Sequence, residues 1–143
     1  MELKDVMTPK VEVIRPEATL QEAAEKMCEL NSGPLPVCDG DRVVGMLTDR
    51  DITIRAVAKG CDPTKTPVRE VMTANLAYAF EDQDVQEATR IMEQCQIRRL
   101  PLLNRDKRLV GIVSLGDLAV NAGDQARAGE ILKHVSEPAD PRR

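Results

Sequence analysis

The chain has 143 residues, 42% of them apolar, which is enough for the hydrophobic core of one compact domain or two tightly joined halves. Its net charge of −4, from 20 basic and 24 acidic residues, argues against nucleic-acid binding, which needs a basic face. No apolar run approaches the roughly 20 residues that span a bilayer, and the N-terminus lacks a secretory signal, so we expect a cytoplasmic protein with no membrane partner.

The first half of the chain predicts five elements in the order β-α-β-β-α. A short strand at 11–14 precedes an amphipathic helix, which begins at TLQE with the spacing of a capping box. Strands follow at 35–38 and 43–47, joined by a tight turn, and a second helix is predicted over 49–59. This half is therefore of the α+β class.

The second half predicts the same series again. LKDVMT at 3–8 corresponds to VREVMT at 68–73, and a capping-box spacing recurs at DVQE. The matching strands and second helix are predicted at 76–80, 100–103, 109–113 and 115–121. One extra residue in the turn between the paired strands changes the offset between the copies, because turns tolerate insertions well.

These patterns divide the chain into two repeats with short additions. The expected parts are repeat 1 at 1–60, a linker at 61–67, repeat 2 at 68–121, a C-terminal helix at 122–135 and a flexible tail at 136–143. A single repeat has little interior of its own. We therefore expect the two β-α-β-β-α repeats to pack about a pseudo-two-fold axis, with their sheets facing each other and their helices outside.

A motif of the form G-x-x-[ST]-x-x-D occurs once in each repeat, in VVGMLTDRDI and in LVGIVSLGDL. It places Thr48 with Asp51, and Ser114 with Asp117, at the turn from a strand into a helix. One interpretation is a helix cap, with the hydroxyl at the N-cap and the carboxylate three residues later. The other is a ribose-phosphate site, since the hydroxyl can donate to a phosphate and the carboxylate can accept from a diol.

Residues near the motif add to the second interpretation. Met46 and Ile112, just before the hydroxyl residues, can contact a flat base. Arg98 and Arg99 lead directly into the strand at 100–103, and guanidinium groups pair well with phosphate oxygens. A solvated helix end is the alternative for these arginines. Repeat 1 has Gly33-Pro34 at the matching positions, so its site is expected to hold a phosphate less well.

The chain offers little for catalysis or for metal binding. Its four cysteines have no CxxC spacing, and His134 is the one histidine, so no metal site and no cofactor are expected. We find no nucleophile with a credible partner and no phosphate-binding glycine loop. The sequence therefore predicts a protein that is not an enzyme.

The doubled VMT, TLQEA, LPV and G-x-x-[ST]-x-x-D patterns resemble a tandem pair of CBS domains, also called a Bateman module, over about residues 3–121. GMLTDRDI and the linker CDP are similar to stand-alone bacterial CBS proteins of the hypoxic-response type. This resemblance implies a cleft that binds adenosine-containing ligands such as AMP, ADP, ATP, S-adenosylmethionine or NAD. It also implies a homodimer, and a regulatory output through dimer contacts or through a protein partner in trans.

The resemblance also implies roles for particular residues. Ser114 and Asp117 would hold ribose and phosphate beside Arg98 and Arg99, with Thr8 and Val13 closing the site. Thr48 and Asp51 would act in a second site, closed by Thr73 and Tyr78. A second hypothesis stays open: a stress-associated homodimeric interaction protein whose motifs only cap helices and which has no physiological nucleotide.

Overall fold

The computed structural model describes residues 1–74, 76–121, 129–130, 132–134 and 136. The chain forms two compact units. Residues 12–76 form one, which we call the first-repeat unit; residues 1–11 together with 77–143 form the other, the second-repeat unit. Each unit combines helices with a small sheet, which confirms the predicted α+β class.

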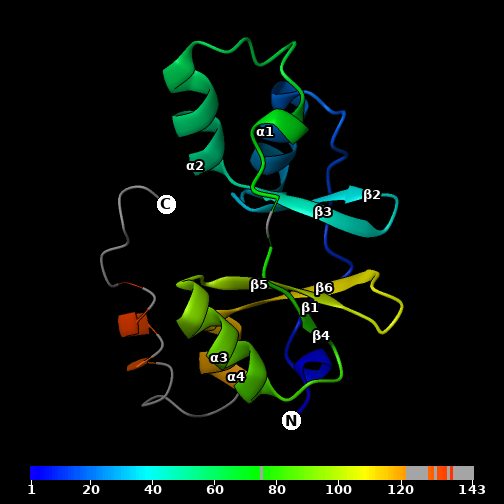
Figure 1. Ribbon diagram of the computed structural model, residues 1–143, viewed down its shortest axis with the longest axis vertical. Coiled ribbons are helices and arrows are strands. Elements are labelled where there is room, and N and C mark those ends of the chain that lie inside the picture. The colour runs from blue at the N-terminus through cyan, green and yellow to red at the C-terminus, as the bar shows by residue number, and fades with distance from the viewer. Residues whose placement is uncertain (75, 122–128, 131, 135, 137–143) are drawn as a thin grey trace. The chain divides into compact units, whose positions relative to one another are not determined.

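The second-repeat unit contains a four-stranded sheet in the order β1-β6-β5-β4. The strands are β1 (Thr8–Pro9), β4 (Ala79–Phe80), β5 (Arg99–Leu103) and β6 (Leu109–Ser114). The helices α3 (Val85–Cys95) and α4 (Leu115–Asn121) lie on one face of this sheet (Figure 1). The β5–β6 pair is the predicted hairpin, with Leu100 opposite Val113, and β4 joins β5 in parallel.

The first-repeat unit contains the matching hairpin of β2 (Leu35–Asp39) and β3 (Arg42–Leu47). Its first helix is α1 (Leu20–Leu30). The predicted second helix over 49–59 is a helical segment of three types in sequence, namely α2 (Asp49–Asp51), a π-helical stretch (Ile52–Ala56) and a 3₁₀ turn (Val57–Lys59). Both helical segments cover one face of the hairpin (Figure 1).

The segments that precede the first helix of each repeat differ from their prediction. The predicted strand at 11–14 is reduced to one bridge between Ile14 and Val37, and the strand predicted at 76–80 is confined to β4. Short 3₁₀ turns open the two repeats at Leu3–Asp5 and Val68–Glu70. Such short pieces have too few apolar positions for a periodic pattern to define their ends.

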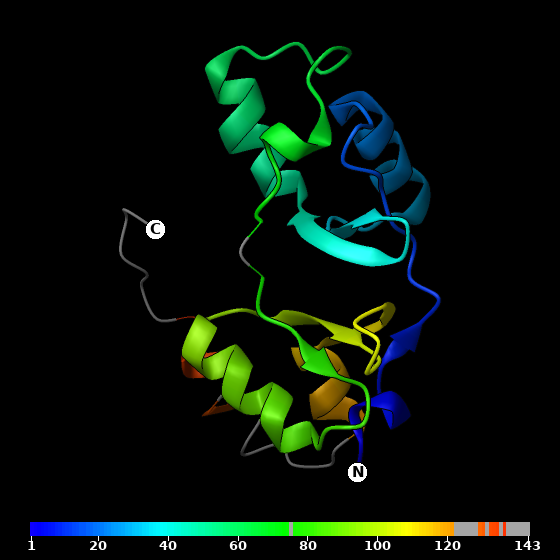
Figure 2. The ribbon, with the colours of Figure 1, turned by 45° about the vertical axis from the view of Figure 1, so that its right-hand side comes forward.

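The two VMT segments pair with strands of the opposite repeat. Thr8 lies opposite Ile112, so β1 extends the second-repeat sheet beside β6 (Figure 2). In the first-repeat unit, Thr73 bridges Met46 of β3 in the same antiparallel sense, with N···O distances of 2.9 and 2.8 Å. Each sheet is therefore completed by the leading segment of the other repeat.

Both cores are aliphatic. Fully buried side chains in the second-repeat unit include Leu3, Met92, Leu100, Leu102 and Val113, and in the first-repeat unit Leu20, Leu35, Val37, Leu47 and Val68. Leu3 and Val68 come from the 3₁₀ turns of the leading segments. Their burial of apolar surface stabilises the exchanged arrangement.

The first helix of a repeat begins with the predicted capping box in one repeat only. Thr19 and Glu22 form the reciprocal capping box at α1, with N···O distances of 3.2 and 3.0 Å. At α3 the capping-box prediction is wrong. Asp84 accepts from the backbone N–H of Gln86, and the carboxylate of Glu87 pairs with Arg90 one turn further along the helix. The nearby guanidinium is a stronger partner for Glu87 than the N-cap amide.

The predicted C-terminal helix over 122–135 falls largely outside the described residues. Within it, 129–130 and 132–134 are helical. Of the predicted tail at 136–143, Ser136 alone is described, and its N–H donates to the carbonyl oxygen of Leu132. Among all described residues, no helix combines the length and the apolar character needed to cross a bilayer.

Candidate functional site

The glycine of each motif lies against the exchanged VMT segment. A Cβ atom at Gly111 would lie 2.5 Å from Sδ of Met7 and 2.9 Å from the carbonyl oxygen of Thr8. At Gly45 the corresponding distances, to Met72 and Thr73, are 2.6 and 2.9 Å. Each motif glycine therefore packs against a VMT segment. This contact places Thr8 and Thr73 beside the strands that precede the two hydroxyl–carboxylate pairs.

Ser114 and Asp117 form a reciprocal pair at the start of α4. The backbone N–H of Ser114 donates to Oδ2 of Asp117 at 2.9 Å, and the N–H of Asp117 donates to the Ser114 hydroxyl oxygen at 3.0 Å. Both side chains are half-buried. The capping interpretation is thus satisfied by the geometry, and the same geometry fixes the direction of the hydroxyl and the carboxylate.

Arg98 and Arg99 lie directly beside this pair. Arg99 is opposite Ser114 in the β5–β6 register, and the carbonyl oxygen of Arg98 accepts from the N–H of Leu115 at 2.8 Å. Both arginines and Ser114 line a surface pocket of about 530 Å³. Its other lining residues are Leu115, Gly116, Ala119, Gly129 and Leu132. The pocket therefore combines two cations and a hydroxyl with an apolar wall.

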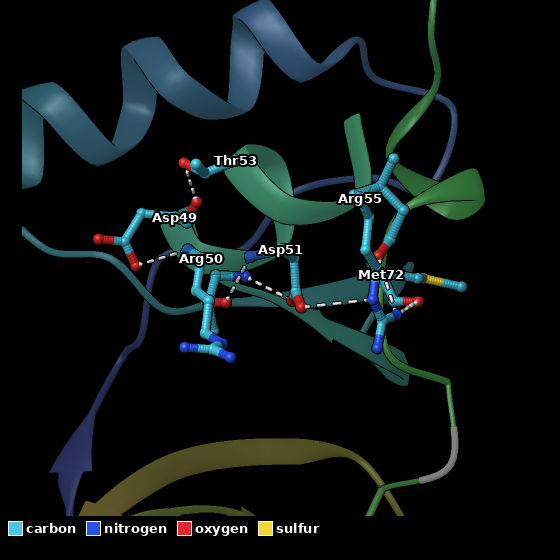
Figure 3. Close-up of polar contacts among 8 residues, drawn as sticks. Asp49, Arg50, Asp51, Thr53, Arg55 and Met72 are labelled. Carbon is cyan, nitrogen blue, oxygen red and sulfur yellow. Dashed lines mark hydrogen bonds and ion pairs between the residues drawn. The ribbon is translucent and has the colours of Figure 1, made fainter. Parts of the chain in front are cut away.

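Thr48 and Asp51 form the equivalent pair in the first-repeat unit. The N–H of Thr48 donates to Oδ2 of Asp51 at 3.0 Å, and the N–H of Asp51 donates to the Thr48 hydroxyl oxygen at 3.1 Å. Figure 3 shows the other oxygen of Asp51 facing Arg55, whose Nε lies 3.9 Å away. The side chain of Asp51 is only 15% exposed, so this carboxylate is well shielded from solvent.

The positions that match the arginines carry no charge in the first repeat. A Cβ atom at Gly33 would lie 2.5 Å from Oδ1 of Asp49, so the carboxylate of Asp49 occupies the space that a side chain would need. Gly33 and Asp49 line a pocket of about 490 Å³ together with Ala24, Met27, Cys28, Asn31, Ser32, Ile52 and Thr53. The carboxylate of Asp49 gives this pocket a negative charge, whereas Arg98 and Arg99 give the other pocket a positive charge.

Most of the predicted site residues lie in the same unit as the hydroxyl–carboxylate pair to which they were assigned. The second-repeat unit holds Thr8, Arg98, Arg99, Ile112, Ser114 and Asp117, and the first-repeat unit holds Met46, Thr48, Asp51 and Thr73. Val13 lies in the first-repeat unit, where its carbonyl oxygen accepts from Nζ of Lys26 at 2.7 Å. Tyr78 lies in the second-repeat unit, where its ring makes an edge contact with Phe80.

Sequence reasoning missed two contributors to these sites. The C-terminal segment reaches the arginine pocket, since Leu132 lines it and the guanidinium of Arg98 donates to the Ser136 hydroxyl oxygen at 3.1 Å. The sequence predicted a helix there, but nothing in it indicates where that helix packs. Arg55 was also missed, although its position four residues after Asp51 is a helical ion-pair spacing.

Within the part of the chain that the structure describes, no three His, Cys, Asp or Glu side chains gather as metal ligands would. Structural zinc sites usually have four such donors.

The sequence matches the CBS-domain family model twice, over residues 3–57 and 68–122. It is 45% identical over 134 residues to the CBS domain-containing protein YhcV of Bacillus subtilis, with 94% of each chain covered. It is 39% identical over 136 residues to Hypoxic response protein 1 of Mycobacterium tuberculosis, again with 94% of each covered.

Solved structures of CBS proteins have the same fold. A crystal structure of Hypoxic Response Protein I with two coordinated zinc ions has a TM-score of 0.77 and 39% identity, covering 84% of this chain and 98% of that one. The CBS pair of protein MJ0100 in complex with 5-methylthioadenosine and S-adenosyl-L-methionine has a TM-score of 0.75 and 28% identity, covering 86% and 96%. CBSX2 in complex with AMP has a TM-score of 0.73 and 26% identity, covering 88% and 98%.

These matches bear on function at the level of the family. CBS pairs are generally regulatory modules without catalysis of their own, and some of the structural relatives bind adenosine compounds. The doubled motifs, the exchanged leading segments and the two family matches agree, and the chain belongs to the CBS-domain family as a tandem pair.

Proposed function

We propose that this chain senses an adenosine-containing nucleotide, and that its main binding site is the arginine pocket beside Ser114 and Asp117. The observation that carries the proposal is the joint lining of one pocket of about 530 Å³ by Arg98, Arg99 and Ser114. That volume is in the range of small-molecule sites. The guanidinium groups suit a phosphate and the Ser114 hydroxyl suits a ribose. The Asp117 carboxylate does not line the pocket but lies next to Ser114.

The relatives support the class of ligand. AMP in CBSX2, and 5-methylthioadenosine with S-adenosylmethionine in the MJ0100 pair, have an adenosine group in common. In this proposal Ile112 contacts the base and Thr8 closes the site, while Met46, Thr48, Asp51 and Thr73 form the second site. The chain acts as a cytoplasmic homodimer that signals through dimer contacts or through a partner in trans.

A second candidate is a stress-associated interaction protein without a physiological nucleotide. The specific observation in its favour is that both carboxylates already complete reciprocal capping boxes, at Asp51 and at Asp117. A carboxylate with a structural role in helix capping does not require a ligand. The similarity to Hypoxic response protein 1 agrees with a role in stress.

Thermal melting with AMP, ADP, ATP, S-adenosylmethionine and NAD separates the two candidates. A ligand at 100 times its Kd adds about 2.7 kcal/mol to the free energy of unfolding. We expect at least one compound to raise the melting temperature of the wild type, and Asp117→Ala to lose most of that rise, because the main site is disabled, while it remains folded.

A matched control comes from α1, where Glu22 closes a capping box outside the proposed sites. Glu22→Ala removes the same kind of capping bond, so its melting temperature falls but its response to the ligand stays. If none of the five compounds moves the wild-type melting curve, the sensor proposal is rejected in favour of the interaction protein.

A further inference from the structure

Arg55 lies between the Asp51 carboxylate and the leading segment of the second repeat (Figure 3). Its Nη1 donates to the carbonyl oxygen of Val71 at 3.3 Å and to that of Met72 at 3.5 Å, and its Nε lies 3.9 Å from Oδ1 of Asp51. The next residue, Thr73, bridges Met46 on β3. Arg55 is therefore a cation that contacts the Asp51 carboxylate directly, in addition to Arg50 within the motif.

The two repeats obtain positive charge from different positions. In the second repeat it comes from Arg98 and Arg99, before β5. The first repeat has Gly33 at the matching position, where the carboxylate of the exposed Asp49 lies in the space that a side chain would enter. Arg55 comes instead from the helical segment that follows the motif.

The second repeat has no cation at the position of Arg55. Counting from Asp51 to Asp117, the residue that matches Arg55 in sequence is Asn121, which is uncharged. Each carboxylate thus has cations nearby, and Arg55, Arg98 and Arg99 each match an uncharged residue in the other repeat. Simple drift of a duplicated surface gives no reason for that complementarity.

The contacts of Arg55 leave it able to bind an anion. The two carbonyl bonds use Nη1 and the ion pair uses Nε, so Nη2 takes part in none of these three contacts. The side chain is 48% exposed. Asp51 is already held by the N–H of Thr48 at 3.0 Å, so the longer 3.9 Å contact with Arg55 is not what fixes its position. The positive charge of Arg55 and the N–H donors of its Nη2 suit a phosphate oxygen.

We propose that Arg55 is a specificity-determining residue of the Asp51 site and selects a phosphorylated adenosine over the uncharged nucleoside. The inference rests on the proposed function. It gives the first-repeat site a phosphate-binding group, although this repeat has Gly33 and Pro34 where the second repeat has Arg98 and Arg99. A purely structural role, in which Arg55 only holds Val71 and Met72, predicts no such preference.

Calorimetric titration of the full chain with AMP and with adenosine tests this proposal. Asp117→Ala disables the other site, and Arg55→Gln is then added to it. We expect Asp117→Ala to keep one AMP site, and the double variant to bind AMP about tenfold more weakly or worse, as loss of a charge-assisted hydrogen bond predicts. Adenosine binding should change less than twofold.

Two further variants control for charge and folding. Arg42→Gln makes the same charge change at the far end of β3 and should leave AMP binding intact. Arg55→Lys keeps the charge and should restore part of the preference for AMP. Thermal melting of each variant confirms that it is folded.

Each contrary outcome has its own meaning. Equal losses of AMP and adenosine binding in the double variant would assign Arg55 a structural role and overturn the inference. Loss of all AMP binding in Asp117→Ala would overturn it as well, because the Asp51 site would then be empty. Failure of the wild type to bind either compound would overturn the inference, whereas the proposed function is rejected only if ADP, ATP, S-adenosylmethionine and NAD also fail to raise the melting temperature.

Discussion

Gly111 lies directly against the backbone of Thr8: a Cβ atom added to Gly111 would be 2.9 Å from the Thr8 carbonyl oxygen. The two residues are separated by about a hundred positions in the sequence, yet they meet where β1 joins β6. The same distance separates a Cβ at Gly45 from the carbonyl oxygen of Thr73. Close backbone approach, rather than an unusual backbone angle, is why each motif contains a glycine here.

Gly111→Ala should destabilise the second-repeat unit. The added methyl group meets a backbone oxygen, which cannot move without displacing β1, and overpacking of this kind typically costs about 1–3 kcal/mol. Urea unfolding followed by circular dichroism measures the loss in the free energy of unfolding.

Gly116→Ala is the matched control. A Cβ atom there has Ser114 Oγ at 3.6 Å as its nearest neighbour, an ordinary contact, and alanine favours the helix by up to about 1 kcal/mol over glycine. Its stability should stay equal to that of the wild type or rise. Equal losses in the two variants would show that the contact with Thr8 is unimportant.

The sequence predicted those parts of the fold that local periodicity defines. The hairpins β2–β3 and β5–β6, and the helices α1, α3 and α4, lie where apolar spacing and turn residues placed them. The family resemblance placed Thr8 at the Ser114 site and Thr73 at the Thr48 site. No local pattern predicts the pairing of Thr8 with Ile112, because it depends on contacts between distant parts of the chain.

The candidate site was predictable to a similar degree. The repeat itself identified Ser114, Asp117, Thr48 and Asp51, and the charge difference drew attention to Arg98 and Arg99. The contact of Arg98 with Ser136 depends on how the C-terminal segment packs, which no spacing encodes. At Asp84 the capping-box spacing was misleading, because a competing arginine attracts Glu87.

The pKa of Asp82 should rise when Arg105 is replaced. The hydrogen bonds from Arg105, at 2.9 and 2.8 Å, hold the pKa of the Asp82 carboxyl below its ordinary value of 3.8, and desolvation opposes them. A depressed pKa in the folded state stabilises the protein above the unfolded pKa, and this contribution disappears as the pH falls through the folded pKa.

Arg105→Gln removes the positive charge, so the pKa of Asp82 should rise towards 3.8. The loss of stability that protonation of Asp82 causes at low pH should then disappear. Carboxyl-carbon NMR titration of both proteins measures the change. Because the pair is exposed, high salt should reduce the difference. An unchanged Asp82 titration in the variant would contradict the prediction.

Cys38 should be the slowest of the described thiols to react. Burial, and secondarily the charge of Asp41, raises the pKa of the Cys38 thiol to about 11, so its reactive thiolate is scarce near neutral pH. Cys28 and Cys95 are exposed. Pulse labelling with iodoacetamide at pH 8, read by peptide mass spectrometry, should modify these two first and Cys38 only after unfolding. Labelling of Cys38 as fast as Cys28 in the native protein would contradict its burial.

Replacing the paired arginines should change the preference of the protein for phosphorylated ligands. Arg98→Gln with Arg99→Gln removes both cations from the pocket beside Ser114, so AMP affinity should fall at least about tenfold while adenosine affinity changes little. The wild-type affinity for AMP should also decrease with salt, and the variant should lose most of that dependence.

Arg90→Gln tests whether net charge alone explains such a loss. Arg90 belongs to the same unit, but its guanidinium is engaged with Glu87 and Gln94 on α3 and does not line the pocket. Its replacement should leave AMP binding within twofold of the wild type. If Arg90→Gln weakens AMP as much as loss of Arg98 and Arg99 does, the effect comes from the overall field of the protein and the arginine pocket is not the phosphate site.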